Sequence, residues 1–347
     1  MTRFVKFLAV FLFNVSAICC QEDYQIKTIA FYNLENLFDT IDDPTKNDES
    51  SPIMGIHGDR AVIYQKKLDN MAKVIAEIGL SESKNSPVIV GVAEIENYKV
   101  LEDLVNTNTL KNKQYGIIHY DSPDLRGIDV ALLYQPAHFR PIHHETFEVR
   151  LWDEQGMRIY TRDQLLVSGY LDDEYIHIIV NHWPSRRGGE EKSSHKREKA
   201  AYVNTQIIEK IRKDDPHAKI IIMGDLNDDP TNISLKKVLK TKAKKAEVQE
   251  GDLYNPMEDM FRRGQHTLVY RDKINLFDQI IFTYPFLTTK KDYSTYKMYK
   301  VGVFNPQYLT TQTGKYKGYP FRSFARSGFL GGYSDHYPVY IHLIKEN

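Results

Sequence analysis

The amino-acid sequence predicts a single α/β (α+β) domain in which two packed β-sheets are covered by helices. Short apolar segments occur in runs along the chain, and a few helical patterns separate them, which is typical of such layered folds. No linker, internal repeat or break in composition divides the 347 residues. Apolar residues make up 41% of the chain and charged residues 27%, as expected of a globular protein with a substantial core.

The first twenty residues differ from the rest of the chain and predict a secretory signal peptide. Arg3 and Lys6 flank the start of an apolar run at residues 7–13. This run is shorter than the roughly 20 apolar residues that a membrane span needs. A buried first strand or helix is the alternative. We therefore expect no transmembrane span, a signal peptide at residues 1–20 and a folded domain at residues 21–347.

The two cysteines of the chain, Cys19 and Cys20, both lie at the end of this segment. Cleavage after Cys20 would leave a mature chain without thiols or disulfides. Lipid attachment at Cys19 or Cys20 is the second possibility, although Ser16, Ala17 and Ile18 fit a lipoprotein signal poorly. Either outcome predicts an exported protein, located in a bacterial periplasm or outside the cell.

The first part of the mature chain predicts a strand, a loop, a helix and a second strand. Residues 26–32 form an apolar run, and residues 40–60 are rich in Asp, Pro, Ser and Gly, which favours a loop. Apolar residues recur at helical spacing over residues 68–78, and Gly79 follows where a helix stop is expected. Residues 87–92 are almost wholly apolar and predict a strand that is buried on both faces.

The remaining chain continues the strand-rich pattern. Further strands are predicted at residues 115–120, 128–134, 146–151, 159–170, 175–180, 219–223, 277–282 and 337–344. Residues 190–213 place apolar side chains on one face and charges on the other, which predicts an amphipathic helix. The lysine-rich residues 236–250 favour a solvated surface over a nucleic-acid-binding patch.

Polar side chains stand at the ends of the predicted strands, and this is the main indication of function. Taken singly, each of them is more often an ordinary turn residue. Six such positions together favour a functional site held on a rigid scaffold. The residues are Asn33, Glu94, His182, Asp225 with Asn227, Asp278, and Asp335 with His336.

These residue types suit a hard divalent cation. Carboxylates and amides predominate and are ligands for Mg²⁺, or for Mn²⁺ or Ca²⁺. The sequence has no His-Glu-x-x-His motif and no cysteine pair suited to zinc. It has no Gly-x-x-x-x-Gly-Lys-Ser/Thr loop, so no nucleotide cofactor is expected, and no Gly-x-Ser-x-Gly motif. A cation that neutralises phosphate charge, a carboxylate that activates water and a histidine that stabilises the transition state would hydrolyse a phosphate ester.

Five segments resemble motifs of the endonuclease/exonuclease/phosphatase superfamily, the DNase I-like metal-dependent phosphodiesterases. Their order and wide spacing are also similar to that family. The pair formed by Gly-Asp-x-Asn and a terminal Ser-Asp-His is specific, although each motif alone is weak. The resemblance extends over residues 26–344 and implies a four-layer α/β/β/α sandwich. The segments are residues 32–38, 92–94, 181–185, 224–227 and 334–339.

The resemblance implies metal ligands among the matching residues. Glu94 would be the principal ligand, Asn33 would lie beside it, and Asp335 would be a further ligand. Glu35 occupies a position that approaches the metal in some relatives, and we group it with the substrate-binding residues.

The resemblance also implies the catalytic groups. Asp225 would orient or deprotonate the attacking water, and Asn227 would donate a hydrogen bond to the scissile phosphate. His182 and His336 would contact phosphate oxygens, and Asp278 would hold the imidazole of His336. An Asp-His pair fixes the tautomer and favours the imidazolium, which suits an anionic transition state.

Three loops are candidates for substrate contacts. Arg126 and Asp129 flank a glycine before a predicted strand and could line the cleft, or could form an ordinary turn with an exposed ion pair. Arg186 and Arg187 follow His182 on a glycine-rich loop and could clamp phosphates, unless the loop is simply solvated. Residues 314–333 mix Gly, Tyr, Phe and Arg and could recognise substrate, or could simply form a surface loop.

The sequence therefore predicts an exported, divalent-metal-dependent phosphodiesterase in which an activated water attacks a phosphate ester. A nuclease is the first expectation, and a sphingomyelinase-like or phosphoinositide-directed hydrolase is the second. The 46 basic and 46 acidic residues give zero formal charge, which argues mildly against a tight DNA binder. A non-catalytic binding module and a paired-carboxylate glycosidase are the remaining alternatives. We expect a monomer, although the sequence gives no direct evidence on oligomeric state.

Overall fold

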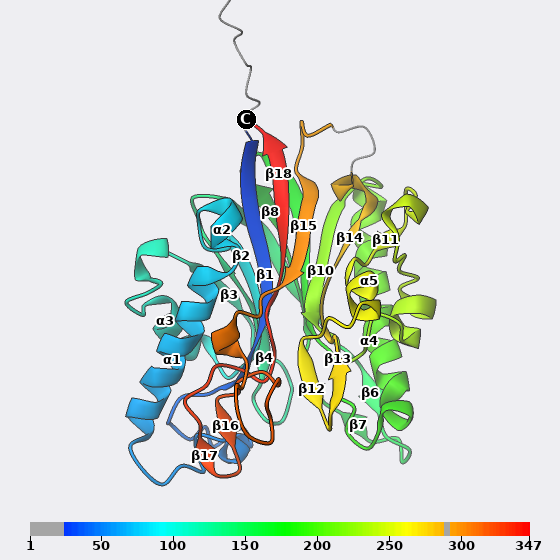
Figure 1. Ribbon diagram of the computed structural model, residues 1–347. Helices are drawn as coiled ribbons and strands as arrows, with labels where there is room; N and C mark the ends of the chain where they lie inside the picture. The colour runs from blue at the N-terminus through cyan, green and yellow to red at the C-terminus, as the bar shows by residue number, and fades with distance from the viewer. Residues whose placement is uncertain (1–23, 288–291) are drawn as a thin grey trace, which may run out of the picture.

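The computed structural model describes residues 24–287 and 292–347 and shows a four-layer α/β/β/α sandwich, as expected from the resemblance. Two six-stranded sheets pack face to face, and helices cover their outer faces (Figure 1). The predicted signal peptide, including Cys19 and Cys20, lies outside the described residues. Within the described residues, the model contains no helix whose length and apolar character would allow it to cross a bilayer.

The first sheet joins the two ends of the described chain. Its strand order is β15-β18-β1-β2-β4-β3. β1 and β2 run parallel, and the other neighbours are antiparallel. The strands are β1 (Tyr24–Leu37), β2 (Ile89–Ile95), β3 (Gly116–His119), β4 (Asp129–Tyr134), β15 (Lys297–Val303) and β18 (Val339–Glu346).

The second sheet comes from the middle of the chain, with the order β11-β14-β10-β9-β8-β5. β9 and β10 run parallel, and the remaining neighbours are antiparallel. The strands are β5 (Phe139–Phe147), β8 (Gln164–Leu171), β9 (Glu174–His182), β10 (Lys219–Asp225), β11 (Leu253–Tyr254) and β14 (Asp278–Thr283). Each sheet therefore has one central parallel pair.

Outside the two large sheets, the described residues form five α-helices, three small hairpins, and six short 3₁₀ or π-helical segments. The hairpins project from the end of the sandwich that lies opposite the C-terminus (Figure 1). The helices are α1 (Arg60–Glu77), α2 (Leu80–Ser83), α3 (Tyr98–Val105), α4 (Glu190–Asp214) and α5 (Met257–Arg262). The hairpins pair β6 (Leu151–Trp152) with β7 (Arg158–Ile159), β12 (Leu268–Tyr270) with β13 (Lys273–Asn275), and β16 (Phe324–Ala325) with β17 (Gly328–Phe329).

The alternation of side chains along the strands explains the layers. On β1, Ile29 belongs to the core between the sheets, whereas Ala30 packs with α1 and α3. On β10, Ile221 lies between the sheets, and Ile222 packs against α4. Successive residues of a strand point to opposite faces. Strands in which successive residues are apolar are therefore buried on both sides, as predicted for residues 87–92 and observed in β2.

Most predicted elements are confirmed, and two predicted strands are wrong. The strand predicted at residues 146–151 is displaced. β5 runs from Phe139 to Phe147, and residues 148–150 lie outside any strand. The predicted strand at residues 159–170 is interrupted at residues 160–163, between β7 and β8. This interruption contains Arg162, whose side chain is buried through ion pairing and hydrogen bonding instead of strand packing. Local strand propensity carries no information about such a tertiary contact.

Candidate active site

The ends of the two parallel strand pairs meet at one end of the sandwich. Asn33 and Glu94 lie at the carboxyl ends of β1 and β2, and His182 and Asp225 at those of β9 and β10. The amide of Asn33 donates from Nδ2 to Glu94 Oε1 at 3.2 Å and to Asp225 Oδ2 at 3.1 Å. One neutral side chain therefore joins carboxylates that belong to different sheets.

Backbone irregularities aim these side chains at the cleft. The β2–β4 register shifts between Ala93 and Ile95, and Glu94 between them has a φ of 59°. Asn227 also has a positive φ, of 50°. Such conformations cost a non-glycine residue of order 1 kcal/mol or more and concentrate at functional sites, where bulges redirect a side chain out of the regular alternation.

Gly224 allows the close approach that places Asp225. Its backbone lies against Asn181 of the parallel strand β9. A Cβ atom at position 224 would lie 2.3 Å from the carbonyl oxygen of Asn181 and 2.6 Å from its Cβ. Glycine is therefore required for steric reasons at the first position of the Gly-Asp-x-Asn segment, because any larger residue would push β10 and Asp225 away from β9.

Glu94, His182 and Asp225 form a group that fits a divalent cation. Each offers one ligand atom, and these atoms lie within 4.8 Å of one another. His182 Nε2 lies 3.9 Å from Glu94 Oε1 and 3.6 Å from Asp225 Oδ2. The hydrogen-bond donor that joins the two carboxylates is the uncharged Asn33, so a cation would compensate their charge.

His336 adds a second, linked group. Its Nδ1 lies 2.7 Å from Asp278 Oδ2, and its Nε2 lies 3.9 Å from Asp225 Oδ2. Burial lowers the pKa of His336, but the charges of Asp278 and Asp225 outweigh burial and raise it well above the usual value. The two carboxylates therefore favour the imidazolium form of His336, and Asp278 holds the ring in one orientation.

His182 has the opposite protonation preference. Burial lowers the pKa of His182 well below its usual value, and the nearby Arg162, Arg126 and His336 lower it further. The surroundings thus favour a neutral imidazole at His182 and a cationic one at His336. Environments that drive two similar groups apart in pKa are typical of sites that need a ligand or acceptor beside a proton donor.

Asp225 lies between these groups. Burial raises the pKa of Asp225 to about 7, with His336 opposing the rise and Asp278 adding to it. A bound cation would favour the carboxylate form. The Oδ1 atom of Asp225 accepts a hydrogen bond from the backbone N–H of Asn227. The side chain of Asn227 donates from Nδ2 to the carbonyl oxygen of Trp183 at 3.0 Å.

Two residues implied near the metal have other partners. Asp335 is 39% exposed, and its Oδ2 accepts a hydrogen bond from Arg322 Nη2 at 3.2 Å. Glu35 is buried, and its carboxylate accepts from Arg322 Nε at 3.1 Å and from the Ser323 N–H at 2.6 Å. Burial first, and then Asp335, raise the pKa of Glu35 to about 7. Arg322 therefore links Glu35 to Asp335 and holds both carboxylates against the segment that begins at residue 322.

The remaining substrate-binding candidates differ in accessibility. Arg126 is half-exposed and bonds Asp124, whereas Asp129 is buried and bonds His119 Nε2 at 3.0 Å and the Ser122 N–H. Arg187 is exposed.

Arg186 is engaged by the segment that follows Asp225. It donates to the carbonyl oxygen of Asn227, pairs with Asp228, Asp229 and Glu190, and lies over the Phe277 ring. Arg186 therefore supports the Asn227 segment.

Two arginines near the site were missed by the sequence analysis. Arg162 is buried, pairs with Asp124 at 3.0 Å and donates to the carbonyl oxygen of Trp183, directly after His182. An arginine inside a predicted apolar strand was the signal that could have revealed it. Arg322 belongs to residues 314–333, which were predicted as a recognition loop without naming this residue.

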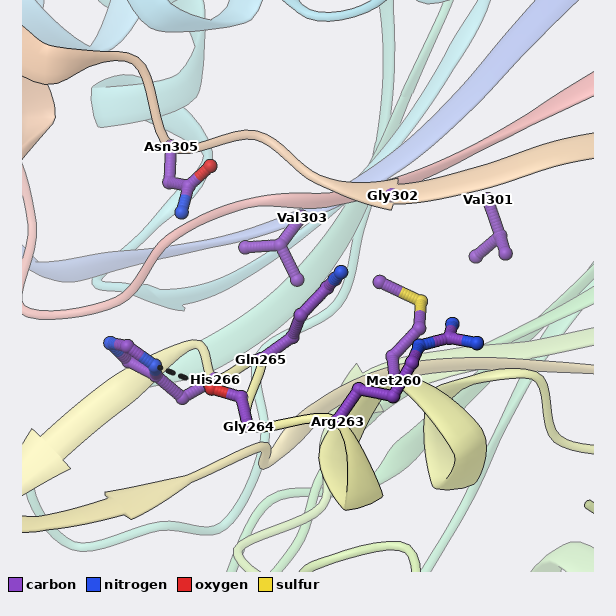
Figure 2. Close-up of a pocket in the computed structure, with 9 residues that line it drawn as sticks. All are labelled: Met260, Arg263, Gly264, Gln265, His266, Val301, Gly302, Val303 and Asn305. Carbon is purple, nitrogen blue, oxygen red and sulfur yellow. Dashed lines mark hydrogen bonds between the residues drawn. The ribbon is translucent and has the colours of Figure 1, made fainter.

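Two hollows lie outside this centre. The larger, of about 940 Å³, is bounded by residues 49–57, Ile63 and residues 322–329, so Arg322 connects it to Glu35 and Asp335. The smaller, of about 410 Å³, lies between β15 and the segment after α5, and Figure 2 shows its residues. Neither lining includes Glu94, His182 or Asp225, and only the larger hollow, through Arg322, is linked to the carboxylates beside them.

Comparisons with known proteins agree with this geometry. The model of the "Endonuclease/Exonuclease/phosphatase family" matches residues 28–345. No curated protein sequence matches the chain.

Three solved structures illustrate the similarity in fold. An endonuclease/exonuclease/phosphatase family protein from Bacteroides thetaiotaomicron is 16% identical, with a TM-score of 0.53, over 94% of this chain and 100% of its own. A mannosyl-6-phosphatase of the same organism is 16% identical, with a TM-score of 0.52, over 91% and 99%. D. rerio TDP2, in complex with single-strand DNA product, is 14% identical, with a TM-score of 0.52, over 92% and 98%.

The family match covers nearly the whole described chain, and the fold and the converging acids and histidines are consistent with it. The chain therefore belongs to the endonuclease/exonuclease/phosphatase family of metal-dependent phosphoric ester hydrolases.

Proposed function

We propose that this chain is a divalent-metal-dependent nuclease that cleaves phosphodiester bonds by attack of water. The observation that carries the proposal is the meeting of Glu94, His182 and Asp225 from two sheets beside the His336–Asp278 pair. Carboxylates and a neutral imidazole would hold the cation, and the imidazolium would face the anionic phosphate.

The residues of the chain divide the chemistry between them. Glu94, with His182 and Asp225 in reach, would hold the metal, and a divalent cation at such a site supplies charge stabilisation to the phosphate. Asp225 orients the attacking water and accepts its proton. His336 donates a hydrogen bond from Nε2 to a phosphate oxygen, and Asp278, which accepts from the opposite ring nitrogen, Nδ1, orients the ring and favours the imidazolium. Asn227 provides the remaining amide donor.

The larger hollow supports a nucleic-acid substrate. It combines three cationic or titratable side chains, Arg322, Arg326 and His57, with the partly exposed ring of Phe329, which packs against the buried ring of Phe324. Arginines bind phosphates, and aromatic rings stack on bases, which is how single strands are commonly held. The similar fold of D. rerio TDP2, whose structure contains a single-strand DNA product, is compatible with this proposal.

A phospholipid headgroup is the second candidate substrate. The hairpins at the active-site end expose large apolar side chains, namely Trp152 and Met157 around β6–β7, Tyr270 and Ile274 on β12–β13, and Leu330 after β17 (Figure 1). Exposed aromatic and apolar side chains of this kind suit a membrane interface as well as nucleobases.

A substrate panel combined with Arg322→Ala separates the two candidates. We expect single-stranded or duplex oligonucleotides to be cleaved with Mg²⁺ or Mn²⁺, and sphingomyelin or phosphoinositide vesicles to be poor substrates. Arg322→Ala should raise KM for the oligonucleotide about tenfold, because one charge-assisted phosphate contact is lost, and should change kcat/KM for bis-p-nitrophenyl phosphate only a few-fold. The matched control is Lys315→Ala, an exposed cation of the same loop. Faster cleavage of vesicles than of any nucleic acid would reverse the ranking.

We also propose export of the chain, on the basis of the basic and apolar pattern of residues 1–20. The mature protein should be a monomer without the first twenty residues, or should begin at a lipid-modified Cys19 or Cys20. Intact-mass measurement of protein expressed in a bacterial host distinguishes these forms, and a Cys19→Ala, Cys20→Ala variant is the control for lipid attachment. Recovery of the full-length chain in the cytosol would contradict export.

A further inference from the structure

A second acidic group lies in the loop that follows β1, away from the catalytic centre. Residues 39–49 contain five carboxylates and one lysine. Asp42, Asp48 and Glu49 each offer one carboxylate oxygen, and these oxygens lie within 4.8 Å of one another. The group shares no residue with the group formed by Glu94, His182 and Asp225.

Asp48 gives this group a property that exposed acidic clusters lack. Its side chain belongs to a residue that is only 1% exposed. Its Oδ2 accepts a hydrogen bond from the Asp43 N–H at 2.9 Å, but its Oδ1 is buried without a hydrogen-bond partner among the described residues. A buried carboxylate oxygen without a partner is costly and requires a compensating group. The hydroxyl of Ser51, three residues later, is a second buried oxygen without a partner.

The nearest lysine in the sequence does not compensate this charge. Lys46 donates from Nζ to the carbonyl oxygen of Ser122 at 3.3 Å, and its side chain packs near Gly127. Burial, with Asp39, Asp48 and Asp43 contributing, raises the pKa of Glu96 beside the loop to about 7. Like charges are therefore crowded around an uncompensated oxygen.

We propose that Asp42, Asp48 and Glu49 form a calcium site separate from the catalytic metal site. The available ligands are oxygens, which suit hard cations, and an irregular loop accommodates the variable coordination of Ca²⁺ better than the strict octahedron of Mg²⁺. The Asn47 N–H bonds the carbonyl oxygen of Leu125, and Glu49 lines the larger hollow. Bound Ca²⁺ fixes this wall of the hollow against the neighbouring loop.

Calcium titration of a protein that lacks the catalytic ligand tests the site. In the Glu94→Gln protein, isothermal titration should still detect one Ca²⁺ with a Kd of about 10⁻⁴–10⁻³ M, the range of extracellular modules. Adding 10 mM CaCl₂ should raise its Tm by about 2–5 °C. Asp48→Asn and Glu49→Gln, each placed in that background, should weaken binding at least about tenfold and remove most of the Tm shift.

Controls keep the test independent of the proposed function. Asp43→Asn changes a neighbouring, partly exposed acid outside the group of three and should keep the Tm shift. Asp42→Asn alone, at a residue outside the lining of the larger hollow, should leave Mn²⁺-dependent hydrolysis of bis-p-nitrophenyl phosphate unchanged, whereas Glu49→Gln is assessed by Ca²⁺ binding. Because Glu49 is exposed, this variant decides the question even if Asp48→Asn fails to fold. Absence of Ca²⁺ binding in the Glu94→Gln protein, or equal binding after Glu49→Gln, would overturn the proposal whatever the substrate proves to be.

Discussion

Replacement of Asp225 by asparagine is expected to lower kcat for metal-dependent hydrolysis of bis-p-nitrophenyl phosphate at least about 1,000-fold. Loss of a general base costs 10²–10⁴-fold, and this substitution also removes a carboxylate from the metal-binding group. The protein should remain folded. Burial raises the pKa of Asp225 to about 7, which means that ionising this carboxyl group destabilises the folded state. A neutral amide of the same shape removes that destabilisation.

Asp228→Asn is the matched control for Asp225→Asn. Asp228 is equally buried and follows three residues later, but it pairs with Arg197 and Arg186 and lies outside the catalytic group. Breaking this buried pairing should cost about 3 kcal/mol of stability and lower Tm, while kcat changes less than tenfold. Thermal unfolding and steady-state kinetics of both variants therefore separate chemistry from folding. Activity within tenfold of the unmutated protein in Asp225→Asn would remove Asp225 from the mechanism.

The layers of the fold could be predicted from the sequence because the hydrophobic pattern of each strand or helix indicates which of its faces are buried. Strands buried on both faces have uninterrupted apolar runs, as at residues 219–223, and α4 has a charged face that shows its outer position. The predicted strand boundaries at residues 146–151 and 159–170 were wrong because they depend on contacts between residues that are distant in the sequence. The buried Arg162 is stabilised by Asp124 and by the carbonyl oxygen of Trp183, and neither partner is adjacent in the sequence.

The residues that converge on the site were also visible in the sequence, since they occur at strand ends. Their orientation was not visible. The positive φ of Glu94 and the Asn33 bridge between sheets arise only when the two sheets pack together. Arg322 was hidden for the same reason, because its partners Glu35 and Asp335 are far away or across a turn in the chain. A loop composition can indicate recognition, but it does not identify which arginine reaches the acids.

Asp278→Asn is expected to lower kcat about 100- to 1,000-fold at pH 8 and to change the pH profile. The charge of Asp278 is the largest influence that raises the pKa of His336 against the lowering effect of burial. Without that charge, His336 loses its proton at lower pH. The alkaline limb of kcat/KM should therefore move down by at least about one pH unit, and the variant should retain a larger fraction of activity at pH 6 than at pH 8.

The pH profile distinguishes this electrostatic role from simple support of the fold. Asp278 Oδ2 lies 2.7 Å from His336 Nδ1, so a structural role alone would lower activity equally at every pH once the protein is folded. The control is His177→Gln, which changes a buried histidine of β9 that bonds Ser168 between the sheet strands, and it should leave the alkaline limb in place. A uniform loss in Asp278→Asn, with the limb unmoved, would show that another group supplies the proton. A downward shift in Asp278→Asn alone identifies His336 as the imidazolium that faces the phosphate, because this is the histidine whose proton Asp278 holds.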